Sequence, residues 1–175
     1  AEGKKNEEVV LMTASLARLL RQSISIENEL VTIGQEIEYV RSYLTIQKMR
    51  YKDKLEFEIN VDPRITHAQI IRLVLQPIVE NAIYHGLKYK ESKGMLKVHG
   101  YELGERIIID ITDDGVGMDE ETLKHIYDKH KVNYHSNGVG VYNVQQRLVL
   151  YYGKEYGIIY HSEKGKGTTA TVVIP

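Results

Sequence analysis

Apolar positions recur at helical spacing along the first third of the chain. Residues 6–23 carry one such stripe, and a second stripe begins just after Thr32. Thr32 and Gln35 have the spacing of a capping box, which predicts that a helix starts there. The stripes consist of Val9, Met12, Leu16 and Leu19 in the first helix and Ile33, Ile37, Val40 and Leu44 in the second. We expect both helices to pack into a core or along a dimer seam rather than to hold a ligand.

The apolar period then changes from helical to alternating. Residues 55–61 alternate apolar and polar side chains, as a half-buried strand does, and Asp62-Pro63 is expected to end that strand. An apolar stretch at helical spacing over 68–88 predicts a helix in which Pro77 fits only the first turn or a kink. Further strands are predicted around Leu96 and Val98 and over 107–111, 156–162 and 168–174, with another helix over 141–152.

This order of elements predicts an α+β fold. Most neighbouring strands are joined by short turns such as Gly104-Glu105, so the sheet should be mixed and largely antiparallel, with helices on one face. A doubly wound sheet would instead need regular alternation of strands and helices. The change of period near residues 52–54 divides the chain into an N-terminal helical segment, 1–52, and a domain, 53–175.

Composition narrows the functional classes. Lys and Arg number 23 against 24 Asp and Glu, and this balance gives no support for a nucleic-acid surface. The sequence holds no Cys, which excludes disulfide scaffolds, thiolate zinc sites and cysteine nucleophiles. No apolar run approaches the roughly 18 residues of a membrane span, and the first residues contain no signal-peptide core. We therefore expect these residues to make no membrane contact.

Two glycine motifs stand next to predicted elements. Asp113-Asp114-Gly115-Val116-Gly117 follows the most apolar strand. It is either a tight turn or a loop whose backbone approaches a ligand while Asp113 accepts a hydrogen bond from it. Gly138-Val139-Gly140 precedes the helix predicted over 141–152, where it either gives flexibility or presents N–H groups to a phosphate.

Polar residues also interrupt the apolar stretch over 68–88. Asn81 is either satisfied by the backbone or offers its side-chain oxygen to Mg²⁺, which prefers oxygen ligands. Near the end of the chain, Gly165-Lys166-Gly167-Thr168-Thr169 taken alone is an ordinary hairpin turn. No Walker A, G-x-S-x-G or H-E-x-x-H motif occurs, which disfavours the sites that those motifs build.

Taken in this order, the four motifs resemble the GHKL ATP-binding fold, which is shared by histidine kinases, gyrase-type and Hsp90-type ATPases and MutL. Residues 75–86 (LQPIVENAIYHG) and 138–148 (GVGVYNVQQRL) are similar to the N and G2 boxes of LytS/YesM-type sensor histidine kinases. Residues 43–51 (YLTIQKMRY) resemble the segment just before the catalytic domain of those kinases. The resemblance runs from about residue 7 to the last residue and implies a two-layer α+β sandwich of the Bergerat type.

The resemblance also implies a role for each motif. Asn81 would hold Mg²⁺ between the ATP phosphates, Asp113 would accept the adenine amino group, and Thr168 would support the base through water. The expected cofactor-binding residues are Asn81, His85, Asp113, Gly115, Gly117, Gly138, Val139, Gly140 and Thr168. The expected catalytic residues are Glu80, Asn81 and Lys88, and Asn81 is the expected metal ligand. Residues 119–137 would form a mobile lid in which Lys124, Lys129 and Lys131 are candidate phosphate contacts.

Two positions depart from the family pattern. Tyr84 stands where many related kinases carry a basic residue, and Lys88 either replaces that residue or is an ordinary surface lysine. Pro77 stands where the hydrolytic members carry a carboxylate that activates water, so we expect water attack to be poor. Glu80, next to Asn81, would either polarise an incoming imidazole or support the metal shell.

The resemblance implies the ATP-binding catalytic part of a two-component sensor histidine kinase that works with a response regulator. None of the seven histidines lies in the motif that carries the phosphoacceptor in these kinases, which is expected upstream, so this chain should bind ATP without phosphorylating itself. A homodimer through the N-terminal or upstream helices and a cytoplasmic location in a membrane-attached sensor are implied as well. The alternatives are a GHKL ATPase, a serine-kinase anti-sigma factor, and a nucleotide-binding module without catalysis.

Overall fold

A five-stranded sheet forms one layer of the protein. The computed structural model describes residues 9–17, 29–126 and 138–175. In these residues the strands run in the order β2-β4-β5-β7-β6, with β2 parallel to β4 and every other pair antiparallel. The strands are β2 (Leu55–Val61), β4 (Gly94–Leu103), β5 (Arg106–Asp113), β6 (Gly157–Glu163) and β7 (Gly167–Ile174). The sheet is therefore mixed and largely antiparallel, as predicted.

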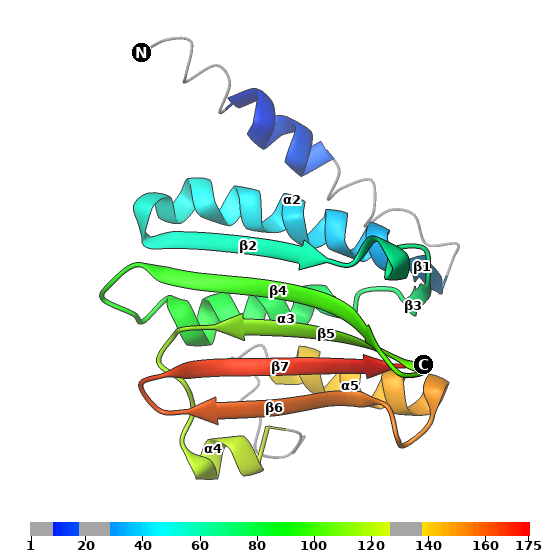
Figure 1. Ribbon diagram of the computed structural model, residues 1–175. Coiled ribbons are helices and arrows are strands. Elements are labelled where there is room, and N and C mark those ends of the chain that lie inside the picture. Colours follow the sequence, from blue (N-terminus) through cyan, green and yellow to red (C-terminus); the bar gives the residue numbers. More distant parts are fainter. Residues whose placement is uncertain (1–8, 18–28, 127–137) are drawn as a thin grey trace.

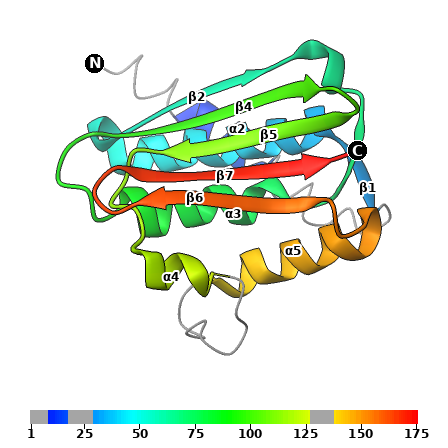
Figure 2. The same cartoon turned by 60° about the horizontal axis from the view of Figure 1, so that its bottom comes forward.

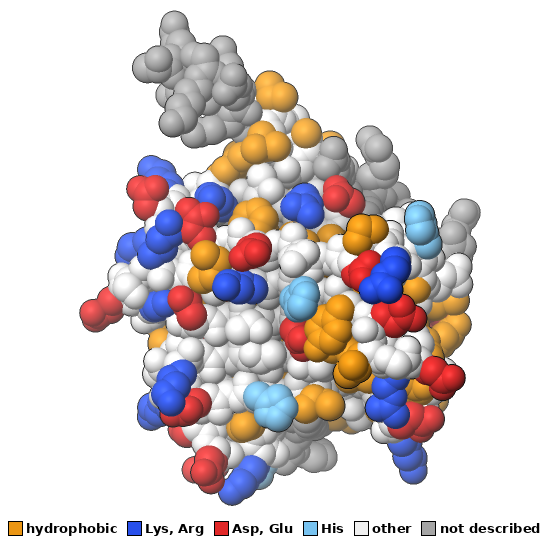
Figure 3. Space-filling model, in the orientation of Figure 1, with side chains coloured by type: hydrophobic (Ala, Val, Ile, Leu, Met, Phe, Trp, Pro, Cys, Tyr) orange, Lys and Arg blue, Asp and Glu red, His pale blue; other side chains and the backbone are white. Residues whose placement is uncertain are grey.

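Helices cover one face of this sheet, which confirms the predicted two layers. Figures 1 and 2 show α2 (Ile33–Tyr51), α3 (Leu75–Asn81) and α5 (Gly138–Tyr152) on the same side. Alternate residues of β5, Ile109 and Ile111, are buried beneath them. On the opposite face, shown in Figure 3, basic and acidic side chains are interspersed.

The helix that precedes the sheet begins as predicted. Thr32 and Gln35 form a capping box: the Gln35 N–H donates to the Thr32 hydroxyl at 3.2 Å, and the Thr32 N–H donates to Gln35 Oε1 at 2.9 Å. Ile33 and Leu44 are fully buried in the same core as the sheet. Before α2, residues 9–17 are helical, and the rest of the helix predicted over 6–23 lies outside the described residues.

The helix predicted over 68–88 is wrong in its first part. Gln69–Ile71 is a strand, β3, paired antiparallel with β1 (Leu30–Thr32). Neither strand was predicted, because short buried strands and buried helical segments have the same apolar pattern. Leu73 then takes a φ of 59°, which separates the strand from α3. Since α3 starts at Leu75, Pro77 falls in its first turn, where the sequence required it to be.

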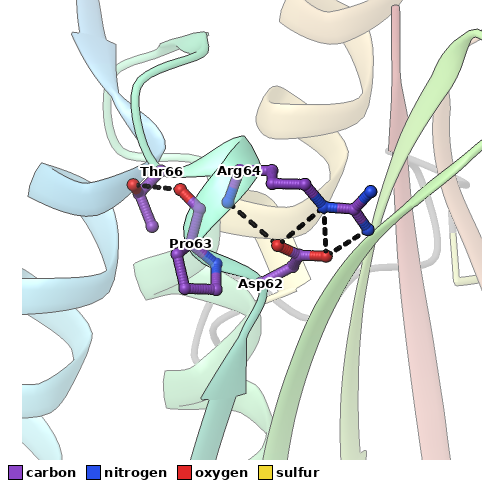
Figure 4. Close-up of polar contacts among 4 residues, drawn as sticks. All are labelled: Asp62, Pro63, Arg64 and Thr66. Carbon is purple, nitrogen blue, oxygen red and sulfur yellow. Dashed lines mark hydrogen bonds and ion pairs between the residues drawn. The ribbon is translucent and has the colours of Figure 1, made fainter.

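Two short 3₁₀ turns flank β2. The first, η1 (Lys52–Lys54), joins α2 to β2, and the second, η2 (Pro63–Ile65), comes directly after β2. Figure 4 shows that the Asp62 carboxylate caps η2 by accepting from the Arg64 N–H at 2.9 Å and from the Arg64 guanidinium. This cap confirms that the strand ends at Asp62-Pro63. Among the described residues, no helix combines the length and the apolarity that a bilayer crossing requires.

Candidate functional site

A cavity of about 530 Å³ lies between the helices and the ends of β5 and β7. It is bounded by α3, by the π-helical turn η3 (Ala82–Leu87) that continues it, and by the short helix α4 (Glu120–Lys124). Five residues predicted for the site line it: Asn81, His85, Asp113, Gly117 and Thr168. The remaining lining residues in the described part of the chain are Ile78, Ala82, Gly86, Ile111, Met118, Asp119, Glu121, Thr122, His125, Ile126, Tyr160 and Ala170.

Asp113 enters this cavity because of the alternation along β5. It is the last residue of the strand and shares its face with Ile111, so its carboxylate is only 4% exposed. The Gly115 N–H donates to Asp113 Oδ1 at 2.9 Å, and the Thr168 N–H also donates to the carboxylate. Burial raises the pKa of Asp113 to about 6, while these two N–H groups oppose the rise. At neutral pH the cavity therefore contains a buried carboxylate that can accept a hydrogen bond from a ligand.

Glycines let the surrounding backbone close around Asp113. A Cβ on Gly86 would overlap the Asp113 carboxylate, and a Cβ on Gly115 would overlap the Gly86 backbone. The Val116 N–H donates to the Gly86 carbonyl at 3.0 Å, which fastens the loop to η3. Gly115 thus packs behind the cavity, whereas Gly117 lines it with a φ of 64° that favours glycine. Gly86 was not among the predicted site residues, although it stands in the same apolar stretch as Asn81.

Asn81 stands where α3 gives way to the π-helical turn. Its Oδ1 atom is buried and has no hydrogen-bond partner among the residues that the structure describes. A buried amide oxygen is costly unless it finds a partner, and it is a ligand type that Mg²⁺ accepts. The described residues contain no cluster of three or more His, Asp or Glu fit to hold a metal. Asn81 therefore fits a metal that takes its other ligands from phosphates and water.

Two residues predicted to be catalytic are Glu80, which lies on α3, and Lys88, which directly follows η3. Among the described residues, neither Glu80 nor Lys88 lines the cavity. Glu80 accepts a hydrogen bond from the Gln76 side chain at 2.7 Å. The Lys88 ammonium lies 5.7 Å from the ring centroid of Tyr84 and 5.6 Å from that of Tyr89. Burial and the nearby Lys88 charge lower the pKa of His85, which keeps that imidazole neutral beside the cavity.

The start of α5 lies beside the first turn of α3. A Cβ on Gly140 would come within 3.4 Å of Pro77 Cβ, so the two helices approach closely there. Gly138 and Val139 open α5, and the first N–H groups of a helix have no acceptor within it. Of the candidate lid lysines, Lys124 lies 3.7 Å from Glu120 in an ion pair, and Lys129 and Lys131 fall outside the described residues.

Ser162 is a supporting residue that sequence reasoning missed. Its hydroxyl accepts from the Met118 N–H at 2.8 Å, donates to the Gly167 carbonyl at 3.0 Å and lies 2.8 Å from the Thr168 hydroxyl. Ser162 thereby ties the loop after Asp113 to β7. No local motif predicts this role, because it depends on the pairing of Ser162 with Thr168 between β6 and β7.

The fold is shared with histidine kinases of known structure. A histidine kinase domain of the blue-light activated histidine kinase from Erythrobacter litoralis EL346 matches 96% of this chain and 74% of its own, with a TM-score of 0.60 and 16% identity. The mycobacterial sensor histidine kinase MprB matches 84% of this chain and 96% of its own, with a TM-score of 0.58 and 23% identity.

Curated relatives extend the similarity to the sequence. Sensor histidine kinase YesM of Bacillus subtilis is 33% identical over 175 residues, which is all of this chain and 29% of that protein. Sensor protein LytS of Oceanobacillus iheyensis is 31% identical over 163 residues, or 91% of this chain and 28% of that protein. The chain therefore spans less than a third of the length of these relatives.

Two family models match successive parts of the chain. Residues 1–55 match the histidine kinase model. Residues 66–175 match the model described as histidine kinase-, DNA gyrase B-, and HSP90-like ATPase, which confirms the resemblance drawn from the four motifs. Because this second match covers more than half of the chain, the protein belongs to the family of histidine kinase-, DNA gyrase B-, and HSP90-like ATPases.

Proposed function

We propose that this chain is the ATP-binding catalytic part of a two-component sensor histidine kinase. It transfers the γ-phosphate of ATP to a histidine outside these residues, for onward transfer to a response regulator. One observation carries the proposal: Asp113 and Asn81 both line a single cavity large enough for a nucleotide, and the buried Asn81 oxygen has no hydrogen-bond partner among the described residues. Cavities of this size hold small ligands when they combine apolar walls with a few polar groups.

The base of the nucleotide occupies the end of the cavity next to Asp113. Adenine presents an exocyclic amino group, and the ionised carboxylate accepts a hydrogen bond from it. Ile78, Ile111 and Ala170 supply apolar walls against which the base packs. The Thr168 hydroxyl, held by Ser162, supports the same end through water.

The phosphates lie toward Asn81 and the start of α5. Asn81 would hold a Mg²⁺, which when bound would offset the charge of the phosphates, as phosphoryl transfer requires. The N–H groups of Gly138, Val139 and Gly140 at the N-terminus of α5 bind the phosphate oxygens, helped by the positive end of the helix dipole. Glu80 and Lys88 act on the acceptor side, because neither lines the cavity among the described residues.

Transfer to a protein histidine is favoured over hydrolysis. The position four residues before Asn81, where hydrolytic members carry a carboxylate, is occupied by Pro77, which offers no base to water. A nucleotide-binding module without catalysis is the second candidate. It is favoured by the placement of Lys88 against Tyr84 and Tyr89 rather than in the cavity.

The partners follow from the same proposal. The apolar stripe of the helical residues 9–17 is exposed at Val9 (58%), Met12 (47%) and Leu16 (51%), and we propose that this face pairs with a second copy or with upstream helices. The whole protein is proposed to be a membrane-attached sensor with this part in the cytoplasm, where ATP and a response regulator are available.

A transfer assay tests the proposal. The chain is incubated with radiolabelled Mg-ATP and a purified acceptor segment from a sensor kinase of the same family. Acid-labile, alkali-stable label on the acceptor is expected, with none on this chain alone. Label that never reaches the acceptor despite tight ATP binding would favour the module without catalysis. Steady phosphate release without acceptor would favour an ATPase.

A further inference from the structure

A buried carboxylate from α2 caps the start of α3. Glu36 is 4% exposed, and its Oε1 atom accepts from the Leu73 N–H at 2.8 Å. Its Oε2 atom accepts from the Val74 N–H at 3.0 Å and the Leu75 N–H at 3.1 Å. Val74 is the N-cap of α3 and Leu75 its first residue, and a helix start leaves their N–H groups without partners. One side chain of α2 therefore satisfies the beginning of the helix that carries Asn81.

The backbone at this cap is held in a conformation that leucine does not favour. Leu73 has a φ of 59°, and a left-handed conformation is unfavourable for a residue with a branched side chain. The hydrogen bond from its N–H to Glu36 holds this turn in place. Removing the acceptor therefore loosens both the turn and the start of α3.

The residues just before Leu73 also form hydrogen bonds with α5. The Arg147 guanidinium of α5 donates to the Arg72 carbonyl at 2.8 Å, one residue before Leu73. The Ile71 N–H donates to the Tyr152 hydroxyl at 3.2 Å. At the other end of α5, Gly140 approaches Pro77 in the first turn of α3. The helix with the phosphate-binding N–H groups is thus aligned on the segment that Glu36 caps.

The adenine end of the cavity, at Asp113, is held by contacts that do not involve Glu36. Asp113 is fixed by the pairing of β5 with β7, by the Gly115 N–H and by the packing of Gly86, and its hydrogen bonds involve no residue of α2. A change at Glu36 should reach this end less than it reaches α3 and α5.

We propose that Glu36 is a positioning residue through which α2 sets the metal and phosphate end of the nucleotide site. This inference rests on the proposed function, because it assigns Asn81 and the start of α5 to that end. It makes the placement of α2, the element that leads into the domain, a condition for correct placement of the phosphates.

Glu36→Gln tests the proposal, because glutamine keeps the size of the side chain but one end of its amide cannot accept from N–H groups. Glu38→Gln is the matched control on the same helix, where the Glu38 side chain is 55% exposed and pairs with Arg41. Affinities for adenosine and for a Mg²⁺-bound non-hydrolysable ATP analogue are measured by calorimetry, at a temperature where circular dichroism shows each variant folded.

We expect Glu36→Gln to weaken the Mg²⁺–analogue affinity about tenfold, the scale typical of residues that orient metal ligands, and Glu38→Gln to leave it unchanged. Adenosine affinity should stay within about twofold in both variants, well under the 1.4 kcal/mol that a tenfold change represents. Hydrogen exchange at Leu73, Val74 and Leu75 should speed up in Glu36→Gln alone.

Three outcomes would overturn the inference. Unchanged affinity for both ligands with only a lower unfolding temperature would give Glu36 a purely structural role. An equal loss for both ligands would show that it shapes the whole cavity without favouring one end. A wild-type chain that binds neither ligand would contradict the proposed function itself, and the inference with it.

Discussion

Asp113 carries a charge in surroundings that make a charge costly. Its carboxylate is 4% exposed and accepts from two backbone N–H groups, yet burial still raises its pKa to about 6. A carboxylate in this condition gains more from a ligand N–H than an exposed one, because it has little water to give up.

Asp113→Asn should lower the affinity for adenosine by about 10- to 100-fold, since hydrogen bonds to charged groups contribute about 1.5–3 kcal/mol. Isothermal titration calorimetry with adenosine measures this without involving the phosphate end. Asp110→Asn is the matched control: it lies on the same strand, and its carboxylate accepts from Tyr101 and Thr171 on the opposite face of the sheet. Equal affinity in wild type and Asp113→Asn would place the base elsewhere.

The raised pKa of Asp113 also predicts how stability depends on pH. Because the folded pKa, about 6, lies above the ordinary 3.8, the folded state binds the proton more tightly than the unfolded state. This contribution to stability is complete below the ordinary pKa and is lost as the pH rises through about 6; the loss is about 3 kcal/mol. Urea unfolding of wild type and Asp113→Asn at pH 4 and pH 7 checks it. The difference between the two should shift in favour of the variant at the higher pH, and a difference independent of pH would contradict it.

At the scale of elements, the meeting of η3 with the loop after β5 shapes the cavity. In the π-helical turn η3, the Gly86 carbonyl accepts from the Val116 N–H at 3.0 Å. Neither Gly86 nor Gly115 has room for a Cβ. A π-helical turn of this kind is frequent at functional sites. The contact fixes the distance between the helix with Asn81 and the strand with Asp113.

Gly86→Ala should therefore lower nucleotide affinity as well as stability. The added methyl group meets the Asp113 carboxylate, and overpacking of this kind costs about 1–3 kcal/mol. Gly104→Ala is the control, because Gly104 has a φ of 63° but open space around it, and the left-handed conformation alone costs about 1–2 kcal/mol. Calorimetric titration with adenosine should show at least a tenfold loss for Gly86→Ala and none for Gly104→Ala. Similar affinities in the two variants would show that the carboxylate moves aside at no cost to binding.

The elements with a clear period were predictable from the sequence. The capping box at Thr32 and the alternation that places Asp113 beneath the helices both follow from local rules. The strand β3 could not be predicted in this way, because the apolar pair Ile70 and Ile71 is equally compatible with a helix and with a strand until its pairing partner is known. The contacts of Glu36 and Ser162 could not be predicted for a related reason. They join residues that are 37 and 44 positions apart in the sequence, so no local pattern indicates them.

The site was predictable in part. From the order of the four motifs, the sequence predicted a single site that contains Asn81, His85, Asp113, Gly117 and Thr168. The structure places all five residues around one cavity. The direction of a side chain from a helix was harder to predict. Glu80 and Lys88 neighbour cavity residues in sequence, but helical rotation and the π-helical turn carry them away from the cavity.

At the scale of the whole molecule, α2 belongs to the same core as the sheet. Separate family models match residues 1–55 and 66–175. Ile33, Val40 and Leu44 of α2 are nevertheless buried against the residues of α3 and the sheet, and β1 pairs with β3. A domain boundary at residues 52–53, as the change of period predicts, would divide this core.

Truncation separates these possibilities. A chain that begins at residue 29 should unfold cooperatively, because it keeps β1 and α2. A chain that begins at residue 53 should not, because each of the three buried side chains contributes about 1.5–3 kcal/mol and a domain has only about 5–15 kcal/mol in total. Thermal unfolding followed by circular dichroism checks both chains. A sharp transition in the shorter chain would establish residues 53–175 as an independent domain.

The proposed function depends most on the convergence of Asn81 and Asp113 on one metal-bound nucleotide. Its most direct measurement is calorimetric titration of the chain with a non-hydrolysable ATP analogue, with and without Mg²⁺, in wild type, Asn81→Ala and the exposed control Asn60→Ala. We predict a single site that Mg²⁺ strengthens at least tenfold in wild type and in Asn60→Ala, and an effect of Mg²⁺ below about threefold in Asn81→Ala. A wild-type chain that binds no analogue at millimolar concentration, or an Asn81→Ala variant with the full Mg²⁺ effect, would contradict this convergence.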